Sequence, residues 1–477
     1  MTTPPPLVAR TLDEANEIIA RQYAENVALK ERVAALEARL AELEARLRQN
    51  STNSSRPPST DLPWSKPKRK PPEGPSGRKA GGQPGHKGQA REPVPSDQVD
   101  ETVDVHPERC GLCGAELPAD LPGEDAYAHQ VTDLPEAQAR VTEYRLWRKR
   151  CPHCGGRTRA KRPADVPEDA FGPRLKAVVT TLTAKYRVSR REMVAVLRDL
   201  FGVEMSVGAV QATCERVSEA VAPAVAVVKD EVATAPAVHA DETGWHQQRE
   251  MHWLWAATTP EAAYFNLAED RGRAALSKLL PDDFAGIVHC DRWRPYERFG
   301  DARQLCHAHL RRDFQAAIDR GGVSRRIGKR LLAQSDRLFH FWHAYRRGEI
   351  DRAQMMRAMK PVQDAWDKAV EAAYADGDAK LYALARDLFK QWDALWTFVR
   401  VEGVEPTNND AERALRPAVL WRKGSFGTRS DAGSAFVGRM RTIIETARRR
   451  GVQPVEWLER ACRAAMLDIA PPPLLSG

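Results

Sequence analysis

The sequence lacks any apolar run long enough to cross a bilayer, and no signal peptide opens it. We therefore expect a cytoplasmic protein without membrane segments. It also carries little net charge for its length. Lys plus Arg number 73 against 65 for Asp plus Glu, a balance of +8 over 477 residues, so the distribution of charge matters more than its total. A chain of this length exceeds one hydrophobic core, which predicts about two to four domains.

Cysteine is scarce as well. Four of the eight cysteines form two CxxC pairs, Cys110–Cys113 and Cys151–Cys154, each followed by a glycine. In a reducing compartment this pattern favours metal over disulfide. Four thiolates form a closed tetrahedral site, so we predict one structural Zn²⁺ in a zinc ribbon over residues 101–165. The alternatives are four unrelated free thiols, or His106 and His153 as substitute ligands.

A heptad pattern fills residues 12–49 and predicts a parallel coiled-coil dimer within residues 1–50. Charges of opposite sign flank the apolar seam, as at Arg32 and Glu37. The alternative is a single amphipathic helix packed on its own protein. The two core positions hold Ile19, Asn26, Val33, Leu40 and Leu47, and Gln22, Leu29, Leu36 and Leu43.

Residues 51–100 are rich in Ser, Pro, Gly and Lys, with few apolar groups, which predicts a disordered linker. A flexible basic arm can follow a phosphate backbone without reading sequence. A solvated linker without a partner is the alternative. The basic residues proposed to contact DNA are Lys68, Arg69, Lys70, Arg78, Lys79 and Lys87.

Two further segments have features of DNA binding. In the ribbon, residues 139–148 have strand character, and Arg148, Lys149 and Arg150 make it basic. Residues 166–231 read as short helices with a capping box at 189–192 and tight turns, which suits a helix-turn-helix reader with Gln211 on its last helix. Helical scaffolding between domains is the alternative for this second segment.

Three acids follow elements that can converge. Asp241 ends the apolar run from Ala237, Asp291 ends a second run at 287–290, and Glu412 lies in a stretch that opens like a helix. Two aspartates on strand ends and a glutamate on a helix can hold divalent cations for phosphoryl transfer. The order of elements over residues 232–425 fits an RNase H-like fold, with an all-α insertion at about 310–402 and a helical segment at 426–477.

Basic side chains flank these acids. We expect them to contact phosphate or the active site, whereas the alternative is an ordinary solvated helix face. A second zinc site at Cys306, His307 and His309 is a further alternative. The flanking candidates are His309, Arg311, Arg312, Arg416, Arg422 and Lys423.

With these motifs, the chain resembles the transposases of the insertion-sequence 66 family over nearly its whole length. Asn53-Ser54-Ser55 and Pro57-Pro58-Ser59 are similar to the linker of that family, as is the run Gly81-Gly82-Gln83. The CxxC pairs resemble its zinc-binding domain. Asp241-Glu242-Thr243, the stretch from Cys306 to Phe314 and Thr407-Asn408-Asn409-Asp410-Ala411-Glu412 resemble its catalytic region. The stretch Asp291-Arg292-Trp293-Arg294-Pro295-Tyr296 departs from the shorter motif expected at the second acid.

The resemblance implies a bacterial, nucleoid-associated DDE transposase that cuts and joins DNA at the ends of an insertion sequence. Asp241, Asp291 and Glu412 would be the catalytic acids and would hold two Mg²⁺ (or Mn²⁺) ions, one activating the nucleophile and one stabilising the leaving oxygen. Double-stranded DNA, a second copy of the chain and accessory proteins of the same element are the expected partners. An RNase H-like nuclease or resolvase, or a zinc-containing DNA-binding protein without catalysis, stays open as an alternative.

The predicted fold class is therefore a multidomain α+β protein. In chain order it has a coiled coil, a linker, a zinc ribbon, a helical DNA-binding-like segment and an RNase H-like catalytic core interrupted by helices.

Overall fold

The computed structural model describes residues 11–54, 61, 92–123 and 127–474, without the side chains of residues 38, 41, 42 and 45. The chain divides into two units, residues 1–66 with 141–477, and residues 67–140. Both helices and strands are present, as the predicted mixed α+β class requires. Among the helices so described, none is both long enough and apolar enough to span a bilayer.

Helix α1 (Leu12–Leu47) matches the segment predicted from the heptads. Thr11 caps its start, because the Thr11 hydroxyl accepts a hydrogen bond from the Glu14 amide at 3.2 Å. The apolar seam faces solvent, with Leu36 60% and Leu43 49% exposed. The helix is confirmed, and its pairing with a second copy stays a prediction.

The second CxxC pair lies in the turn of a short hairpin of β1 (Arg148–Arg150) and β2 (Arg157–Arg159). The strand expected at 139–148 is wrong except at its last residue: the described residues 139–147 have no regular secondary structure. The short hairpin explains why the strand does not extend further back. The last hydrogen bond from the β2 side is donated by the Ala160 amide to the Trp147 carbonyl, at 2.8 Å. In the other unit, Ser96–Gln98 forms a single 3₁₀ turn, η2.

Four helices follow: α2 (Pro173–Ala184), α3 (Arg190–Phe201), α4 (Val207–Ala220) and α5 (Ala222–Ala233). The predicted capping box is confirmed at Ser189 and Glu192. Gly202 ends α3 at φ 62°, and Ser206 caps α4. Their buried side chains join one cluster that continues through the sheet to the C-terminal helices. The predicted boundary at 231 therefore separates segments that share a core.

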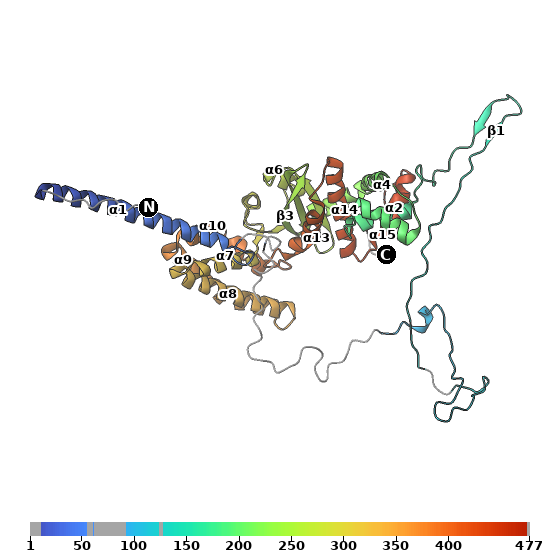
Figure 1. Cartoon of the computed structure of the whole chain (residues 1–477), viewed down its shortest axis with the longest axis horizontal. Helices are drawn as coiled ribbons and strands as arrows, with labels where there is room; N and C mark the ends of the chain where they lie inside the picture. The colour runs from blue at the N-terminus through green and yellow to red at the C-terminus, as the bar shows by residue number, and fades with distance from the viewer. Residues whose placement is uncertain (1–10, 55–60, 62–91, 124–126, 475–477) are drawn as a thin grey trace. The chain divides into compact units, whose positions relative to one another are not determined.

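A five-stranded sheet forms the centre of this body (Figure 1). Its order is β5-β4-β3-β6-β7, with β4 antiparallel to β3 and β5, and β6 parallel to β3 and β7. The other four strands are β4 (Glu250–Thr258), β5 (Ala263–Ala268), β6 (Ile287–Cys290) and β7 (Arg303–Leu305), and β6 coincides with the apolar run predicted at 287–290. The first strand, β3 (Ala237–Gln247), is much longer than expected.

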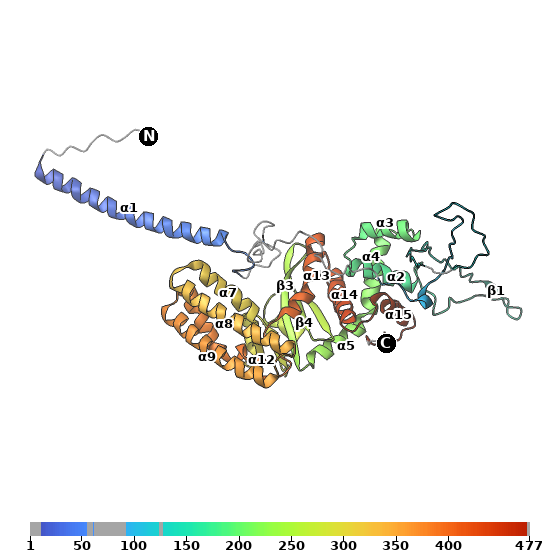
Figure 2. The same ribbon diagram turned by 90° about the horizontal axis from the view of Figure 1, so that it is seen from below.

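The two faces of the sheet pack differently, as strand alternation requires. On β4, Leu254 and Ala256 pack with α13 (Asn409–Ser425) and α14 (Asp431–Arg449), while Trp255 and Ala257 join the main core. Helices α13 and α14 lie side by side across the first face (Figure 2). On the other side, α6 (Arg273–Leu279) contacts β4 and β5.

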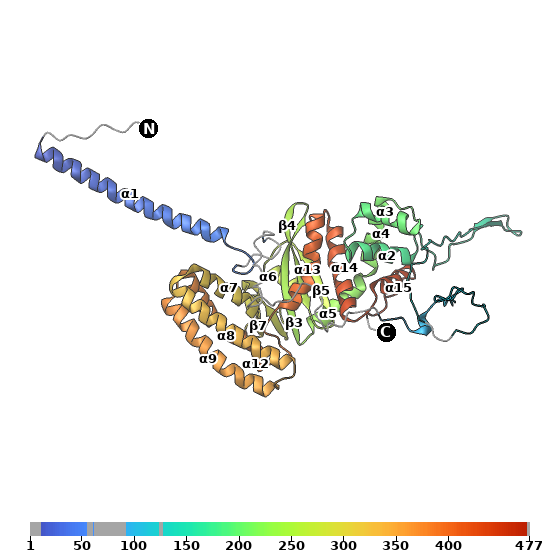
Figure 3. The same ribbon diagram turned by 60° about the horizontal axis from the view of Figure 1, so that its bottom comes forward.

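Helix α14 also covers the open edge of the sheet. The Thr442 and Thr446 hydroxyls accept hydrogen bonds from the backbone amides of Phe265 and Ala263 on β5, at 3.0 and 3.1 Å. These amides would otherwise be unpaired donors on an edge strand, which is a template for aggregation. Helix α15 (Pro454–Met466) then returns to pack on α2 (Figure 3).

The chain between β7 and α13 consists of helices and connecting loops and contains no strand, as predicted for the insertion. Long helices α7 (His307–Arg320), α8 (Gly322–Arg346) and α9 (Arg352–Asp376) pack in sequence, and α10 (Ala379–Lys390) packs on α9. Two short helices, α11 (Trp392–Leu395) and α12 (Thr397–Arg400), then lead back to the sheet. Between β6 and β7 the chain forms the 3₁₀ helix η3 (Arg294–Phe299).

Candidate active site

Asp241 does not end its strand, contrary to the sequence prediction. Strand β3 continues to Gln247 because β4 pairs with it over that whole length. Its other neighbour, β6, pairs only with residues 237–239. Asp241 thus lies just beyond the point where β3 loses its parallel partner. The apolar run in the sequence ends where pairing with β6 ends, and not where the strand itself ends.

The other two acids approach the same point from separate elements. Asp291 follows the last residue of β6, and its carboxylate accepts a hydrogen bond from the Trp293 amide at 2.7 Å. Glu412 lies in the first turn of α13, which packs on β3 and β4. Alternation along β3 puts Asp241 on the same face as Trp245, the face that α13 covers, whereas Glu242 points to the opposite face.

The charges of the other acids act on Asp241, so its electrostatics are those of a carboxyl group with acidic neighbours. Burial, and then repulsion by Glu242, Asp291 and Glu412, raises the pKa of Asp241 well above its usual value. Burial also raises the pKa values of Asp291 and Glu412, although Arg271 and Arg312 respectively oppose the increase. Carboxylates held together against their repulsion favour protons or a divalent cation.

The start of α13 is fixed by two buried or half-buried side chains of the Thr407–Arg413 motif. The Asn408 amide nitrogen Nδ2 donates to the Ala240 carbonyl on β3 at 2.7 Å, at the residue before the first acid. Asp410 accepts a hydrogen bond from Thr258 on β4 at 2.6 Å and pairs with Arg449 on α14 at 2.8 Å. These contacts explain why a motif with one catalytic candidate contains several polar residues.

A second group of potential ligands lies beside Glu412. Ligand atoms of Cys306, His309 and Glu412 lie within 4.8 Å of one another, a spacing that, within the described ranges, the three acids alone do not reach. The Cys306 sulfur accepts a hydrogen bond from the Asn408 amide at 3.2 Å, and burial raises its pKa to about 12. Two members of the alternative second zinc site, Cys306 and His309, thus lie together beside Glu412.

The alternative zinc site also requires His307, and the structure separates this side chain from the other two. His307 is fully buried among Trp366, Trp396 and Phe398, and its Nε2 atom bonds the Leu395 carbonyl at 2.9 Å. By contrast, the Nδ1 atom of His309 lies 3.7 Å from Glu412. Burial lowers the His309 pKa to about 4, so this ring is neutral near pH 7.

The predicted basic residues divide into two groups. Arg312 lies 4.0 Å from Glu412. Arg311 instead pairs with Asp336 on α8 at 2.7 Å, a contact between two helices of the insertion. The Arg422 guanidinium bonds the Gly244 carbonyl on β3. Arg416 and Lys423 are exposed on α13. Of these candidates, the structure brings His309 and Arg312 to the acids.

Sequence reasoning missed a network on the opposite face of β3. Glu242 is fully buried, pairs with Arg271 at 2.6 Å and accepts a hydrogen bond from the Tyr296 hydroxyl at 2.8 Å. Arg271 in turn lies between Trp253 and Trp293. The sequence did contain a sign of this network: residues 291–296, which differ from the motif expected at the second acid, contain both Trp293 and Tyr296.

The two CxxC pairs form the same local turn, each within its own unit. The Cys110 amide bonds the Ala115 carbonyl at 2.8 Å, and the Cys151 amide bonds the Gly156 carbonyl at 2.7 Å. Gly114 and Gly155 have φ of 75° and 68°, which explains the glycine after each pair. Backbone amides of the following residues lower the pKa of both Cys110 and Cys151. Each turn suits two zinc ligands.

The remaining DNA-contact candidates differ in accessibility. Arg148, Lys149 and Arg150 are exposed on β1. The Gln211 side chain is partly buried, accepts a hydrogen bond from Arg190 and donates one to Glu215, so both of its polar atoms already have partners within the protein. The six linker residues between Lys68 and Lys87 lie outside the described residues.

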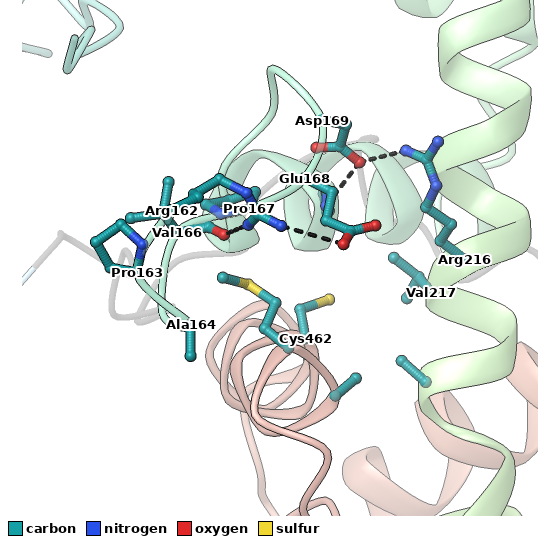
Figure 4. Close-up of a pocket in the computed structure, with 14 residues that line it drawn as sticks. Arg162, Pro163, Ala164, Val166, Pro167, Glu168, Asp169, Arg216, Val217 and Cys462 are labelled. Atoms are coloured by element: carbon teal, nitrogen blue, oxygen red, sulfur yellow. Dashed lines mark hydrogen bonds and ion pairs between the residues drawn. The ribbon is translucent and has the colours of Figure 1, made fainter. Parts of the chain in front are cut away.

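A cavity of about 570 Å³ lies between residues 162–169 and helices α2, α4 and α15 (Figure 4). Its charges are matched within its own wall: Lys176 pairs with Asp169 at 2.9 Å and Arg162 with Glu168 at 3.1 Å, and Arg216 also pairs with Asp169. These groups are therefore already compensated, and none of the three acids lines the cavity.

Comparison with known proteins defines the class to which this arrangement belongs. The zinc-finger binding domain of IS66 transposases matches residues 107–155, which include both CxxC pairs, and supports zinc binding. The model of the IS66 transposase family matches residues 169–435, more than half of the chain and all three acids. The chain thus belongs to the IS66 family of transposases. A family of unknown function matches residues 3–92.

Two curated relatives come from Sinorhizobium fredii. The uncharacterized protein y4qI is 26% identical over 237 residues, which are 44% of this chain and 42% of that protein. The uncharacterized protein y4hP is 24% identical over 406 residues, 77% of this chain and 72% of that protein. The chain thus spans less than half of the first relative and about three quarters of the second.

Proposed function

We propose that the protein cleaves DNA at the ends of its insertion sequence and joins the freed 3′ ends to a target, using an RNase H-like core. The observation that carries the proposal is the approach of Asp291, which follows β6, and Glu412, in the first turn of α13, to Asp241 on β3, whose pKa both of them raise. The sheet order β5-β4-β3-β6-β7 and the helix α13 that follows the insertion support the RNase H-like assignment.

The donor set fits divalent cations. It consists of carboxylates alone, the ligands that Mg²⁺ and Mn²⁺ prefer. The Glu412 atom Oε1 is buried without a hydrogen-bond partner among the described residues, as expected of a ligand that is completed by a cation. Bound divalent cations, two in our proposal, would supply charge stabilisation to an in-line displacement at phosphorus.

The protein groups around the acids have distinct tasks. Arg312, 4.0 Å from Glu412, limits the repulsion on that carboxylate. His309 is neutral near pH 7 and can accept or donate a hydrogen bond to the substrate without adding charge. Asn408 keeps the first turn of α13 against β3. The exposed residues Arg416 and Lys423 would hold the DNA backbone near the acids.

We also propose that Cys110, Cys113, Cys151 and Cys154 bind one structural Zn²⁺, and that α1 pairs two copies of the chain. The zinc proposal rests on the two matching turns and on the family match that spans them. The pairing proposal rests on the exposed seam of α1. A dimer would offer one catalytic core to each end of the element.

The test is a strand-transfer assay on DNA that carries the terminal sequences of the element, with Mg²⁺ or Mn²⁺ and with a chelator. Asp241→Asn, Asp291→Asn and Glu412→Gln should each reduce cleavage and joining at least about 100-fold while DNA binding persists. The matched control is Asp301→Asn, because Asp301 is an exposed acid between η3 and β7, and this variant should remain active.

Three outcomes separate the alternatives. Cation-dependent cleavage without joining would indicate a nuclease of the same fold. Binding without cleavage by the wild type would favour a non-catalytic DNA-binding protein. Full activity of any acid variant would remove that residue from the site.

A further inference from the structure

A tryptophan with a large exposed surface stands next to the second acid. Trp293 is 37% exposed although it lies only two residues after Asp291, whose carboxylate accepts the Trp293 backbone hydrogen bond at 2.7 Å. It is the residue immediately before η3, whose Tyr296 side chain is fully buried. The backbone of Trp293 is therefore fixed directly to the acid site.

The indole ring is held in one orientation. Its Nε1 atom donates to the Arg271 carbonyl at 3.1 Å, so the polar edge of the ring is already bonded. The Arg271 guanidinium lies 4.1 Å from the centre of the Trp293 ring and 4.9 Å from that of Trp253. A cation stacked on an aromatic ring stabilises that orientation.

The charge of Arg271 has its own partner within the protein. Its guanidinium pairs at 2.6 Å with Glu242, whose side chain is fully buried and also bonded to Tyr296. Because Glu242 already neutralises Arg271, we assign this arginine to holding the Trp293 ring and not to binding a phosphate. What the cluster offers to a ligand is consequently the apolar surface of Trp293.

We propose that Trp293 is a stacking platform for an unpaired nucleobase at the cut end of the DNA, beside the scissile phosphate. This inference rests on the proposed function, because it assigns a substrate contact at the same site. Every base has an aromatic face, and stacking on a protein ring requires no base-specific hydrogen bond. A base taken out of the duplex next to the acids would also keep the adjacent phosphate in place.

A purely structural role is the competing explanation. In that case Trp293 would only close the turn between Asp291 and η3, and its removal would act through misfolding or displacement of Asp291. The two roles differ in one respect. A stacking role requires a base on the DNA, whereas a structural role affects intact and abasic DNA equally.

The experiment uses the full chain and a duplex of the element end with unpaired nucleotides at the cut site. One version carries 2-aminopurine, a fluorescent base that stacking quenches, and a second carries an abasic nucleotide at the same position. Loss of stacking by Trp293→Ala should reduce cleavage about 5- to 150-fold, the equivalent of roughly 1–3 kcal/mol per base. Trp293→Phe should keep most of the activity.

The abasic DNA should reduce wild-type cleavage by a similar factor but should not reduce that of Trp293→Ala further. Tyr382→Ala is the matched control, since Tyr382 is an aromatic residue that is 38% exposed on α10. It should resemble the wild type in both assays. Circular dichroism and thermal midpoints compare the folding of all variants.

The inference is overturned if Trp293→Ala cleaves as well as Tyr382→Ala, or if it loses the same factor again on abasic DNA. Retained quenching in Trp293→Ala would overturn it as well. Failure of the proposed function has a different signature, because the wild type would then quench 2-aminopurine without cleaving. Absence of both quenching and cleavage would reject both proposals.

Discussion

Replacing Asn408 with alanine tests how the first turn of α13 is held against the sheet. The Asn408 side chain is fully buried, and its Nδ2 atom donates at 2.7 Å to the Ala240 carbonyl. That carbonyl belongs to the residue before Asp241, on the side of β3 where β6 pairs no further than His239. Asn408→Ala would leave it buried without this donor.

The expected loss follows from that single unsatisfied group. A buried acceptor without its donor costs about 1–3 kcal/mol in the free energy of unfolding. Glu412 lies one helical turn after Asn408, so a small displacement of that turn also moves a catalytic candidate. Misplacement by about 1 Å can reduce a rate about 100-fold, and we expect cleavage to fall by about 10- to 100-fold at temperatures where the variant is folded.

Urea unfolding followed by circular dichroism measures the first effect, and the cleavage assay measures the second. Asn409→Ala is the control for stability, because the neighbouring Asn409 side chain is only partly buried at the first position of α13. It should lie within about 0.5 kcal/mol of the wild type. If Asn408→Ala unfolds at the same urea concentration as Asn409→Ala, the hydrogen bond does not hold α13 as argued.

Three further predictions concern metal, pairing and pH. Cys110→Ser with Cys113→Ser should lose one Zn²⁺ per chain by metal analysis and weaken DNA binding; zinc-free wild-type protein purified without chelators would contradict this. Residues 1–50 should associate by sedimentation, and Leu36→Lys with Leu43→Lys should make them monomeric, because both leucines are exposed and no other described part of the chain covers them. In cation-free protein, Asp241→Asn should be more stable than the wild type by an amount that grows above about pH 4. The raised pKa of Asp241 stabilises the wild type at pH values below the pKa of the unfolded state. That stability is lost as the pH rises through the pKa of the folded state. Urea midpoints measured across pH check the sign, and a constant difference would refute it.

The helices could be predicted because their signals are local. Thr11, Ser189 and Ser206 each cap a helix through their own side chain, and Gly202 ends one in the left-handed region. The insertion was predictable for the same reason, since its apolar residues repeat at helical spacing over long segments. Such patterns need no knowledge of what lies across the fold.

The length of β3 could not be predicted, because it depends on partners that are distant in sequence. The apolar run stops near Asp241, yet β4 pairs with β3 as far as Gln247. Beyond Asp241, the turn after α13 adds a further partner, since the Thr428 amide bonds the His246 carbonyl at 2.8 Å. The strand predicted at 139–148 failed for the opposite reason, as its hairpin partner is short.

The acids were predictable as candidates, but their surroundings were not. Asp241 and Glu242 are adjacent in sequence and chemically alike, and only the alternation of β3 separates the face that meets Glu412 from the face that meets Arg271. Likewise, His307 and His309 looked equivalent as ligands. The helix start at His307 places the first ring in the core and the second beside Glu412.

The difference in length between β3 and β6 explains why the candidate acids lie at this end of the sheet. Where β6 ends, Asp291 follows it, and β3 continues past that point with Asp241 beside the place where β3 has no parallel partner. The Ala240 carbonyl in that gap needs a donor, and Asn408 supplies it together with the helix that carries Glu412. Ligands of open α/β sheets bind at the carboxyl ends of parallel strands for a similar reason.

The same position connects the acids to the insertion. Arg292, the residue after Asp291, bonds Asp313 on α7 at 2.5 Å and Asp387 on α10 at 2.6 Å. A movement of either helix would therefore act on the backbone next to the second acid. Because α7 also carries His309 and Arg312, the insertion has contacts beside both Glu412 and Asp291. Its interruption of the core between β7 and α13 is in this respect part of the construction of the site.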